Sequence, residues 1–225
     1  MDLYEAMRTT FAAREFTDEP LPEGTLFSIL DRARFAPSGG NRQGWHVIVV
    51  RDRATREGLA ACTVPAAKRY TAQLKAGESP WNTVDPTSAD AATIEQTTPA
   101  QRLIDPVLKA PVVLVLCVDL KVVASTDQYL DRVGIISGAS IYPFAWNILL
   151  AAREHGFGGT ITTLAVAEEP TIKALLGVPG HVAVCSVMPL GRPVKQLTKL
   201  RRKTVSEFAR CDGWGGAPFT AEGCA

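Results

Sequence analysis

Ala36-Pro37-Ser38-Gly39-Gly40-Asn41-Arg42-Gln43-Gly44-Trp45 lies between a helical pattern (Leu26 to Phe35) and a strand pattern (His46 to Val50). The adjacent glycines let the backbone approach a ligand without interference from a Cβ atom. Ser38, Asn41 and Gln43 add short polar side chains that donate and accept hydrogen bonds. This composition favours a ligand-binding loop, and the mixed donor and acceptor edge of a flavin ring is the ligand that fits it best.

A plain turn is the alternative interpretation of this loop, because Ser, Asn and Gly are ordinary turn residues. Other chemistries find less support. No GxGxxG follows a strand, and Gly39-Gly40 is not followed by GK[ST]. The three histidines lie far apart, which argues against a metal site, and Ser38 lacks a GxSxG context. What remains is a site of polar loop residues, arginines and backbone groups, which suits cofactor chemistry.

Three short apolar runs predict buried strands: Trp45 to Val50, Pro111 to Val118 and His181 to Leu190. Amphipathic patterns predict outer helices between them. The alternation of helices and strands indicates an α/β or α+β fold. The predicted outer helices span Asp2 to Thr9, Glu23 to Phe35, Ala54 to Ala61 and Glu169 to Leu176.

A longer block, Gly134 to Phe157, mixes Ala, Gly, Leu and Ile. It is barely long enough for a membrane span and carries charges near its end, so it predicts a buried central helix. Pro143 either kinks this helix or marks where its regular hydrogen bonding begins. Gly156 and Gly158 supply the stop signal.

The composition sets outer limits on function. A chain of 225 residues fits one domain. Its formal net charge of +1 gives no electrostatic footprint for nucleic acid or an anionic membrane. Five widely spaced cysteines without a CxxC pair favour reduced thiols. An acidic N-terminus unlike a signal peptide adds to the expectation of a cytoplasmic protein.

The segment from Cys62 to Asp105 has no sustained periodicity. Long segments of this kind in a compact fold are usually functional lids or disordered. Tyr70 and Trp81 favour a lid, because disordered linkers seldom keep large aromatic side chains. A surface insertion with a short helix at Ala66 to Lys75 is the alternative.

Four stretches together resemble the FMN-dependent nitroreductase superfamily. The family's N-terminal cluster ending in Arg-x-Phe is similar to Thr9 to Phe16, and its Pro-Ser-x-x-Asn-x-Gln-Pro-Trp loop to Pro37 to Trp45, with Gly44 in place of the proline. Its small-residue helix is similar to Ser137 to Gly156, and its C-terminal basic cluster to Lys199 to Phe208.

The resemblance implies an α+β nitroreductase-like fold, with a mostly antiparallel central sheet flanked by helices. It implies an intertwined homodimer with the long helix at the interface. The whole of residues 1–225 would form one such domain, with a lid or insertion at about 63–105 and a C-terminal extension at about 192–225.

The resemblance also assigns roles to individual positions. The Pro37 loop would face the flavin and its ribityl chain, and Arg14 would lie at the ribityl or pyrimidine edge. The residues after the glycine turn would bring a backbone N–H to flavin N5, and a C-terminal arginine would pair with the phosphate. The implied cofactor residues are Arg14, Pro37, Ser38, Gly39, Asn41, Thr162, Thr163, Leu164, Arg201 and Arg202, with Tyr70 and Trp81 as substrate-stacking lid residues.

The implied activity is FMN-dependent, NAD(P)H-driven reduction of nitroaromatics, quinones or similar electron-poor acceptors by ping-pong hydride transfer through flavin N5, with no catalytic side chain and no metal. Phe11 and Ala12 depart from the family, which often carries a basic residue and a Ser there, so FMN affinity is expected to be weaker unless Arg8 substitutes. Two alternatives stay open: a dehydrogenase or oxidase that tailors a specific metabolite, and a non-catalytic flavin-binding member.

Overall fold

A computed structural model describes residues 1–224. Its centre is a sheet of β1 (Trp45–Val50), β2 (Val112–Asp119), β3 (Gly158–Gly159) and β4 (Val182–Gly191), in the order β1-β2-β4-β3. Every pairing between these strands is antiparallel. The three predicted strands are present, and their alternation with helices gives the expected α+β fold. The expected burial is confirmed for β2 and β4 but is wrong for β1, an edge strand in which only Val50 is buried.

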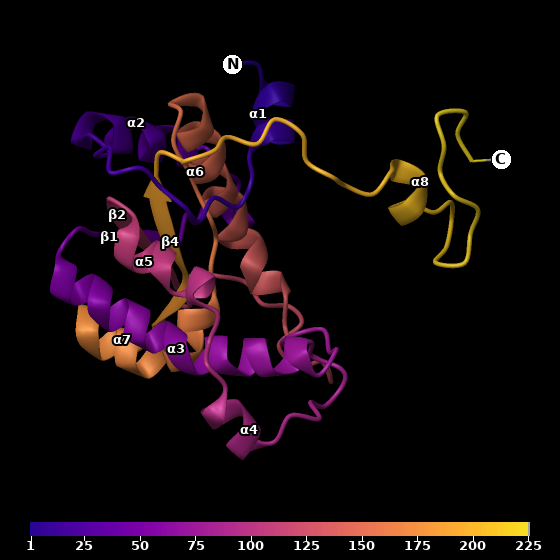
Figure 1. Ribbon diagram of the computed structural model, residues 1–225. Helices are drawn as coiled ribbons and strands as arrows, with labels where there is room; N and C mark the ends of the chain where they lie inside the picture. The colour runs from indigo at the N-terminus through magenta and orange to yellow at the C-terminus, as the bar shows by residue number, and fades with distance from the viewer. Residues whose placement is uncertain (225) are drawn as a thin grey trace.

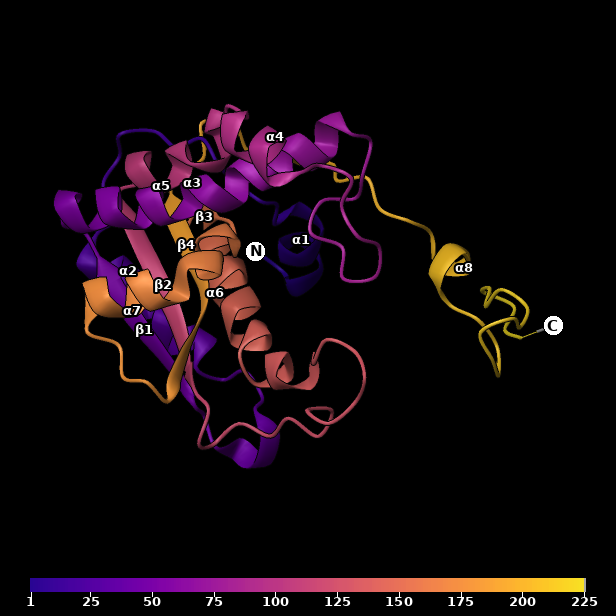
Figure 2. The same ribbon diagram turned by 90° about the horizontal axis from the view of Figure 1, so that it is seen from below.

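β2 lies at the middle of the sheet and is buried on both faces, which explains its continuous apolar run. Leu114 and Leu116 belong to one core cluster, with α2 (Glu23–Ala33) and α6 (Tyr142–Glu154). Val113 and Val115 belong to a second cluster on the other face. That face is covered by α3 (Arg53–Lys75), α5 (Asp105–Lys109) and α7 (Glu169–Leu176), as Figures 1 and 2 show.

Three of the four predicted outer helices agree with the structure to within two residues at either end. They are α1 (Leu3–Thr9), α2 and α7. The remaining helices are α4 (Ala91–Gln96) and α8 (Val205–Phe208). Short 3-10 turns are η1 (Gly39–Asn41), η2 (Gln101–Leu103), η3 (Ile136–Ser140) and η4 (Leu164–Glu168).

The fourth outer helix is much longer than predicted, because α3 runs from Arg53 to Lys75 and so includes the first part of the predicted lid. Its sides contact α4 and α5 as well as α7 and η4. A helix packed on several sides carries no single apolar stripe, so the periodicity on which the prediction relied is weak. The helix proposed at Ala66 to Lys75 is present, as the continuation of α3.

The central helix is shorter than predicted. Regular α-helix begins only at Tyr142, where Pro143 occupies the first turn, and the preceding Ile136–Ser140 is a 3-10 helix. A proline in the first turn loses no hydrogen bond, because those N–H groups have no intrahelical acceptor. Gly156 ends the helix as expected, with φ +77°.

A C-terminal arm leaves the body after β4 and carries α8 away from it (Figure 1). Within the arm Cys211 and Cys224 form a disulfide, so the expectation of five free thiols is wrong; Cys62, Cys117 and Cys185 are free. A local turn brings the two sulfurs together, because the N–H of Cys211 donates to the carbonyl of Ala217 at 2.9 Å.

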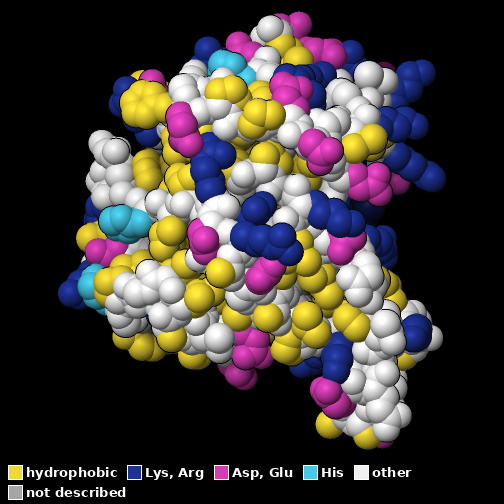
Figure 3. All heavy atoms as spheres, turned by 60° about the vertical axis from the view of Figure 1, so that its left-hand side comes forward, with side chains coloured by type: hydrophobic (Ala, Val, Ile, Leu, Met, Phe, Trp, Pro, Cys, Tyr) yellow, Lys and Arg dark blue, Asp and Glu magenta, His cyan; other side chains and the backbone are white. Residues whose placement is uncertain are grey.

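Charged side chains of both signs are interspersed over the face seen in Figure 3, in keeping with the balanced charge of the chain. None of the helices formed by residues 1–224 is both long and apolar enough to cross a membrane.

Candidate functional site

The Pro37 loop adopts a backbone that few residues tolerate. Gly40, Asn41 and Gln43 all have positive φ, at 60°, 53° and 51°. Asparagine is among the residues that tolerate this left-handed region, whereas Gln43 is a costlier occupant. Backbone strain of this kind persists only where surrounding contacts hold it, and it concentrates at functional sites.

Hydrogen bonds within the Pro37 loop and close packing against Val122 hold this backbone in place. The Oγ of Ser38 accepts the backbone N–H of Gln43 at 2.9 Å, and the Gln43 side-chain amide donates to Oδ1 of Asn41 at 3.1 Å. A Cβ atom at Gly44 would lie 2.7 Å from Val122 Cγ2, so the glycine found in place of the family's proline accommodates this close approach. Pro37, Gly39 and Asn41 remain exposed.

Arg14 is positioned by an extended N-terminal segment that runs beside β3. Ala12 forms a parallel bridge with Gly159, and the N–H of Ala13 donates to the carbonyl of Gly159 at 2.9 Å. Gly159 must lack a side chain there, because an added Cβ would lie 2.3 Å from the carbonyl oxygen of Pro189. The Arg14 guanidinium is exposed, and among residues 1–224 its one hydrogen bond is to the carbonyl of Ala12, at 3.3 Å; no carboxylate in that range pairs with it.

The segment after the glycine turn is fixed to β4. Thr162 and Val187 exchange backbone hydrogen bonds at 3.3 and 2.9 Å, and η4 starts at Leu164. Within the described chain the N–H of Thr163 has no acceptor among the hydrogen bonds formed. Arg14, Tyr70, Thr162, Thr163 and Leu164 all line one small cavity of about 170 Å³. The structure therefore brings three of the predicted groups together.

A larger cavity of about 930 Å³ adjoins the small one, with Tyr70, Thr163 and Leu164 lining both. Trp81 lines it as well. Its other walls come from α3, the end of β2, the start of β4, η3, η4, the first residue of α6 and the connecting segments next to these elements. They are Ala66, Pro80, Val118, Leu120, Gly134, Ile135, Ser137, Gly138, Ile141, Tyr142, Val166, Ala167, Ala183, Val184 and Cys185.

The backbone N–H, the indole N–H and the ring face of Trp81 each contact a residue of α3. Its backbone N–H donates to Oε1 of Gln73 at 3.1 Å, and its indole N–H donates to the carbonyl of Ala66 at 3.3 Å. The guanidinium carbon of Arg69 lies 4.4 Å from the ring centroid, a cation–π contact. Trp81 also has φ +56°, a backbone conformation that these contacts support.

Glu78 fixes the turn that precedes Trp81. Its carboxylate accepts the N–H and the hydroxyl of Ser88, each at 2.6 Å, the hydroxyl of Thr87 at 2.7 Å and the side-chain amide of Gln73 at 3.1 Å. These bonds, the one from the Ser88 hydroxyl first, lower the pKa of Glu78 to about 2. The predicted lid thus contains a closed hydrogen-bond network next to the cavity.

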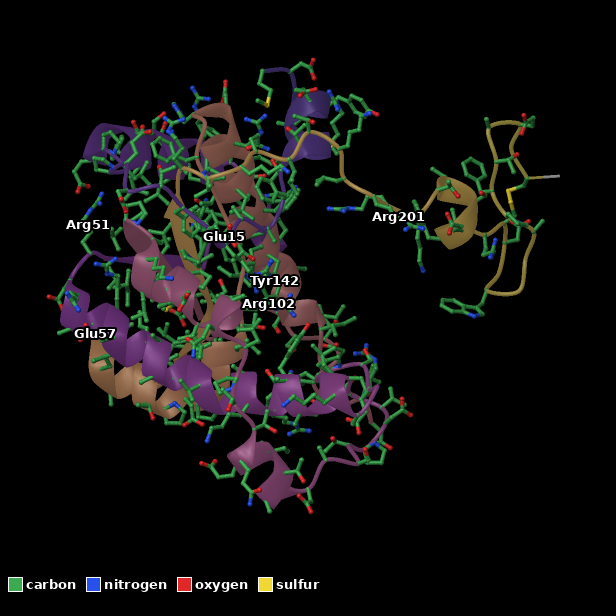
Figure 4. The ribbon with its side chains drawn as sticks, viewed as in Figure 1. Glu15, Arg51, Glu57, Arg102, Tyr142 and Arg201 are labelled. Carbon is green, nitrogen blue, oxygen red and sulfur yellow. A yellow bond between two sulfur atoms is a disulfide. The ribbon has the colours of Figure 1, made fainter. Side chains whose placement is uncertain are left out.

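The remaining predicted residues lie elsewhere on this chain. The Pro37 loop residues line neither cavity. Arg201 and Arg202 are exposed on the C-terminal arm, and Figure 4 shows Arg201 well away from Tyr142 in the body. The predicted cofactor residues therefore form three groups in a single chain: the cavity group, the loop and the arm.

Sequence reasoning missed Tyr142, Cys185 and Gln73. The hydroxyl of Tyr142 donates to the carbonyl of Cys185 at 3.4 Å, and both residues line the large cavity. Burial raises the pKa of Tyr142 and raises the pKa of Cys185 to about 12. Tyr142 sits beside Pro143 within the predicted helix, but no sequence signal distinguishes its cavity-facing position from a core one.

The fold agrees with a family match. The Nitroreductase family model matches residues 7–192, and the chain belongs to this family. The match confirms the family resemblance and covers three of the four sequence stretches; Lys199 to Phe208 lies beyond the matched residues.

Individual relatives cover most of the chain. A Methanothermobacter thermautotrophicus protein named NADH dehydrogenase/NAD(P)H nitroreductase is 28% identical over 197 residues, covering 87% of this chain and 79% of the relative. Among solved structures, oxidized iodotyrosine deiodinase bound to FMN and 3-iodo-L-tyrosine has a TM-score of 0.68 at 19% identity, covering 95% of this chain and all of that one. NADPH:FMN oxidoreductase from Vibrio harveyi, complexed with NAD⁺, has a TM-score of 0.60 at 20% identity, over 89% of this chain and 72% of that one.

Proposed function

We propose that this protein is an FMN-dependent oxidoreductase that uses NAD(P)H to reduce quinones, nitroaromatics or similar electron-poor acceptors. One observation carries the proposal. A small cavity with a free arginine, Arg14, shares the wall of Tyr70, Thr163 and Leu164 with a large apolar cavity. Together the two adjoining cavities offer a cationic end and a large apolar wall, which suits a cofactor and its substrate sharing one site.

The residues present fit FMN. Arg14 has no carboxylate partner among residues 1–224 and would offset negative charge at the pyrimidine edge. The N–H of Thr163 is available as a donor toward N5. Arg202, with Arg201 beside it, would pair with the phosphate, and the Pro37 loop, with Pro37, Ser38, Gly39 and Asn41, would face the ring and ribityl chain.

When bound, FMN supplies two-electron hydride chemistry at N5. Overall, NAD(P)H gives up a hydride, and a quinone gains that hydride and one solvent proton to become a hydroquinone. The side chains of this protein bind and orient the nicotinamide cofactor and the electron acceptor, and they exclude water from the site. None is needed as an acid or base, because the proton comes from solvent.

We further propose that a second copy of the chain completes the site. The Pro37 loop lines neither cavity of its own chain and the arm extends away from the body, so a partner in a homodimer would bring its loop and arm to the cavities. Exposed apolar side chains on α1 and α6 support an interface there. They are Leu3, Tyr4 and Met7 on α1 and Trp146 on α6.

Steady-state kinetics of the FMN-loaded protein with NADPH or NADH and a quinone test the activity. Parallel double-reciprocal plots are the expected signature of ping-pong transfer. Turnover only with a metabolite and oxygen would instead support the dehydrogenase or oxidase alternative. Tight flavin binding with no turnover would support the non-catalytic one. Light scattering of the eluting protein measures whether it is a dimer.

A further inference from the structure

The disulfide between Cys211 and Cys224 closes a small lobe, residues 209–224, at the end of the C-terminal arm (Figure 4). The lobe also has backbone hydrogen bonds of its own, such as the one from the N–H of Phe219 to the carbonyl of Ala209 at 3.1 Å. It lies beyond the part of the chain that the family model matches, so the family match does not account for it.

The arm is attached to its own body at one end only. The last attachment is at Thr198, whose carbonyl accepts the Arg8 guanidinium at 3.2 Å. Beyond Thr198, as far as residue 224, no hydrogen bond or ion pair joins the arm to the body. Arg201 and Arg202, the proposed phosphate ligands, therefore lie between this attachment and the lobe at the free end.

The end of the arm exposes aromatic side chains. Trp214 in the lobe is 100% exposed, and Phe219 in the lobe and Phe208 on α8 are exposed as well. Tryptophan is a frequent anchor at protein interfaces, because its burial removes a large apolar area from water. An exposed aromatic cluster at the end of an arm is therefore suited to docking on a protein surface.

The charge of the arm identifies a suitable surface. Residues 193–224 carry six of the 24 Lys and Arg of the chain and only three of its 23 Asp and Glu. The rest of the chain therefore has a net negative formal charge. A basic arm with an apolar end is complementary to the body of a second copy of this chain, and its own body is contacted only up to Thr198.

We propose that the lobe is a redox-dependent anchor, which docks on a second copy of the chain through Trp214 and so holds Arg201 and Arg202 at the phosphate of FMN. The inference rests on the proposed function and adds a regulation to its cofactor site. An arm attached at both ends keeps its guanidinium groups in place, so FMN binds without the entropic cost of ordering them. Opening of the disulfide releases the far attachment and lowers the affinity for FMN.

The disulfide opens by exchange with a dithiol reductant. Cys224 is exposed whereas Cys211 is buried, so a thiolate of the reductant attacks Sγ of Cys224, and Cys211 leaves as a thiolate that takes up a proton. The second thiol of the reductant then closes on the first and releases Cys224. The protein gains two electrons and two protons, and the dithiol becomes a disulfide. Without the crosslink over 13 positions, the lobe loses the restriction on its unfolded state.

Fluorescence titration with FMN, before and after reduction of the protein by dithiothreitol, tests the effect on the cofactor site. Reduction is expected to weaken FMN binding at least about fivefold, a difference of about 1 kcal/mol, and to leave the affinity for riboflavin, which lacks the phosphate, unchanged. Cys224→Ser should show the weaker affinity with or without dithiothreitol. Cys62→Ala, at a free cysteine outside the arm, should respond as the wild type does. Equal FMN affinity before and after reduction would overturn the proposal.

Acrylamide quenching of the flavin-free protein tests the docking itself, with the Trp214 signal taken as the difference between the wild type and Trp214→Phe. In the oxidised dimer Trp214 should be shielded at least about threefold relative to free indole, and dithiothreitol should remove the shielding. A Trp214 that is quenched like free indole in the oxidised dimer would contradict the proposal. Shielding that persists after dilution to the monomer would contradict it as well, because the lobe would then lie on its own body.

The two measurements keep the inference separate from the proposed function. If the protein binds no FMN, the proposed function fails, and the quenching experiment still decides whether the lobe docks on a second copy. If FMN binds with the same affinity in both redox states, the flavin function stands and the redox-dependent anchor is wrong.

Discussion

The backbone N–H of Gly39 donates to the Oγ of Ser140 at 3.2 Å and so joins the Pro37 loop to the turn that leads into α6. Ser140 is buried, and Ser137 and Gly138 in the same turn line the large cavity. The proposed flavin loop and the large cavity therefore share one structural support. A substitution in the Pro37 loop is expected to change the affinity for FMN before it changes any other property.

Asn41 tests that loop. Asn41→Ala removes the side-chain amide and also disfavours the left-handed φ of 53°, whereas Asn41→Gly removes the amide and keeps this backbone conformation accessible. Loss of one hydrogen bond of about 1–2 kcal/mol predicts a roughly 5- to 30-fold weaker FMN affinity in both variants. Fluorescence titration measures it. Full flavin occupancy and unchanged turnover in Asn41→Gly would contradict the assigned role.

An Arg202 variant distinguishes the contribution of the phosphate to FMN affinity from that of the flavin ring. Arg202→Ala is expected to weaken FMN binding by about 10- to 150-fold, the equivalent of a charge-assisted hydrogen bond of about 1.5–3 kcal/mol. Riboflavin lacks the phosphate, so its affinity should not change. Lys203→Ala on the same arm is the matched control. Equal losses for FMN and riboflavin would indicate a structural effect of the arm rather than a phosphate contact.

The Asp127 carboxylate is expected to make the free energy of unfolding depend on pH. Its carboxylate is 3% exposed and accepts the N–H of Ile135 at 2.7 Å and the Arg132 guanidinium at 2.8 Å. These bonds, that from Ile135 foremost, lower its pKa from 3.8 to about 2. A lowered folded-state pKa means that the stabilisation is complete above the unfolded-state pKa and is lost as the pH falls through the folded-state pKa.

Asp127→Asn is therefore expected to lower the free energy of unfolding at about pH 7, and by a smaller amount at about pH 3. Urea unfolding at the two pH values measures this difference, with the exposed Asp131→Asn as control. A deficit that is the same at both pH values would refute the role of the carboxylate charge.

The arm disulfide predicts the count of reactive thiols. Alkylation of the denatured, non-reduced protein should modify only Cys62, Cys117 and Cys185, and reduction should add Cys211 and Cys224. Mass spectrometry of the intact chain measures the number of alkylated cysteines directly. Five alkylated cysteines without reduction would show that the purified protein carries the thiols that the sequence pattern suggested.

Apolar runs were enough to predict β1, β2 and β4, because each run has clear turn residues at its ends. β1 lies at the edge of the sheet, where only Val50 is buried, and the two-residue β3 has no apolar run. The length of α3 was not predictable in this way, since a helix packed on several sides shows no apolar stripe. The pairing of Cys211 with Cys224 depends on a local turn that no spacing rule identifies.

The candidate site likewise has a part that could be predicted from the sequence and a part that could not. Arg14, Tyr70, Trp81 and the Thr162 segment could be named from the sequence only through family resemblance and aromatic content. Their meeting at two adjoining cavities depends on the bridges of Ala12 to Gly159 and of Thr162 to Val187, which join distant parts of the chain. Gln73 was missed because its role lies in a tertiary hydrogen bond to a backbone of unusual φ.

The central claim is that this chain binds FMN and reduces it with a nicotinamide cofactor. An anaerobic absorbance spectrum of the protein with FMN, recorded before and after addition of NADPH or NADH, tests it most directly. The account predicts a protein-bound oxidised flavin spectrum that is bleached by at least one of the two nucleotides. Bound flavin that stays yellow with both would contradict the reductase function, and failure to bind FMN would contradict the site itself.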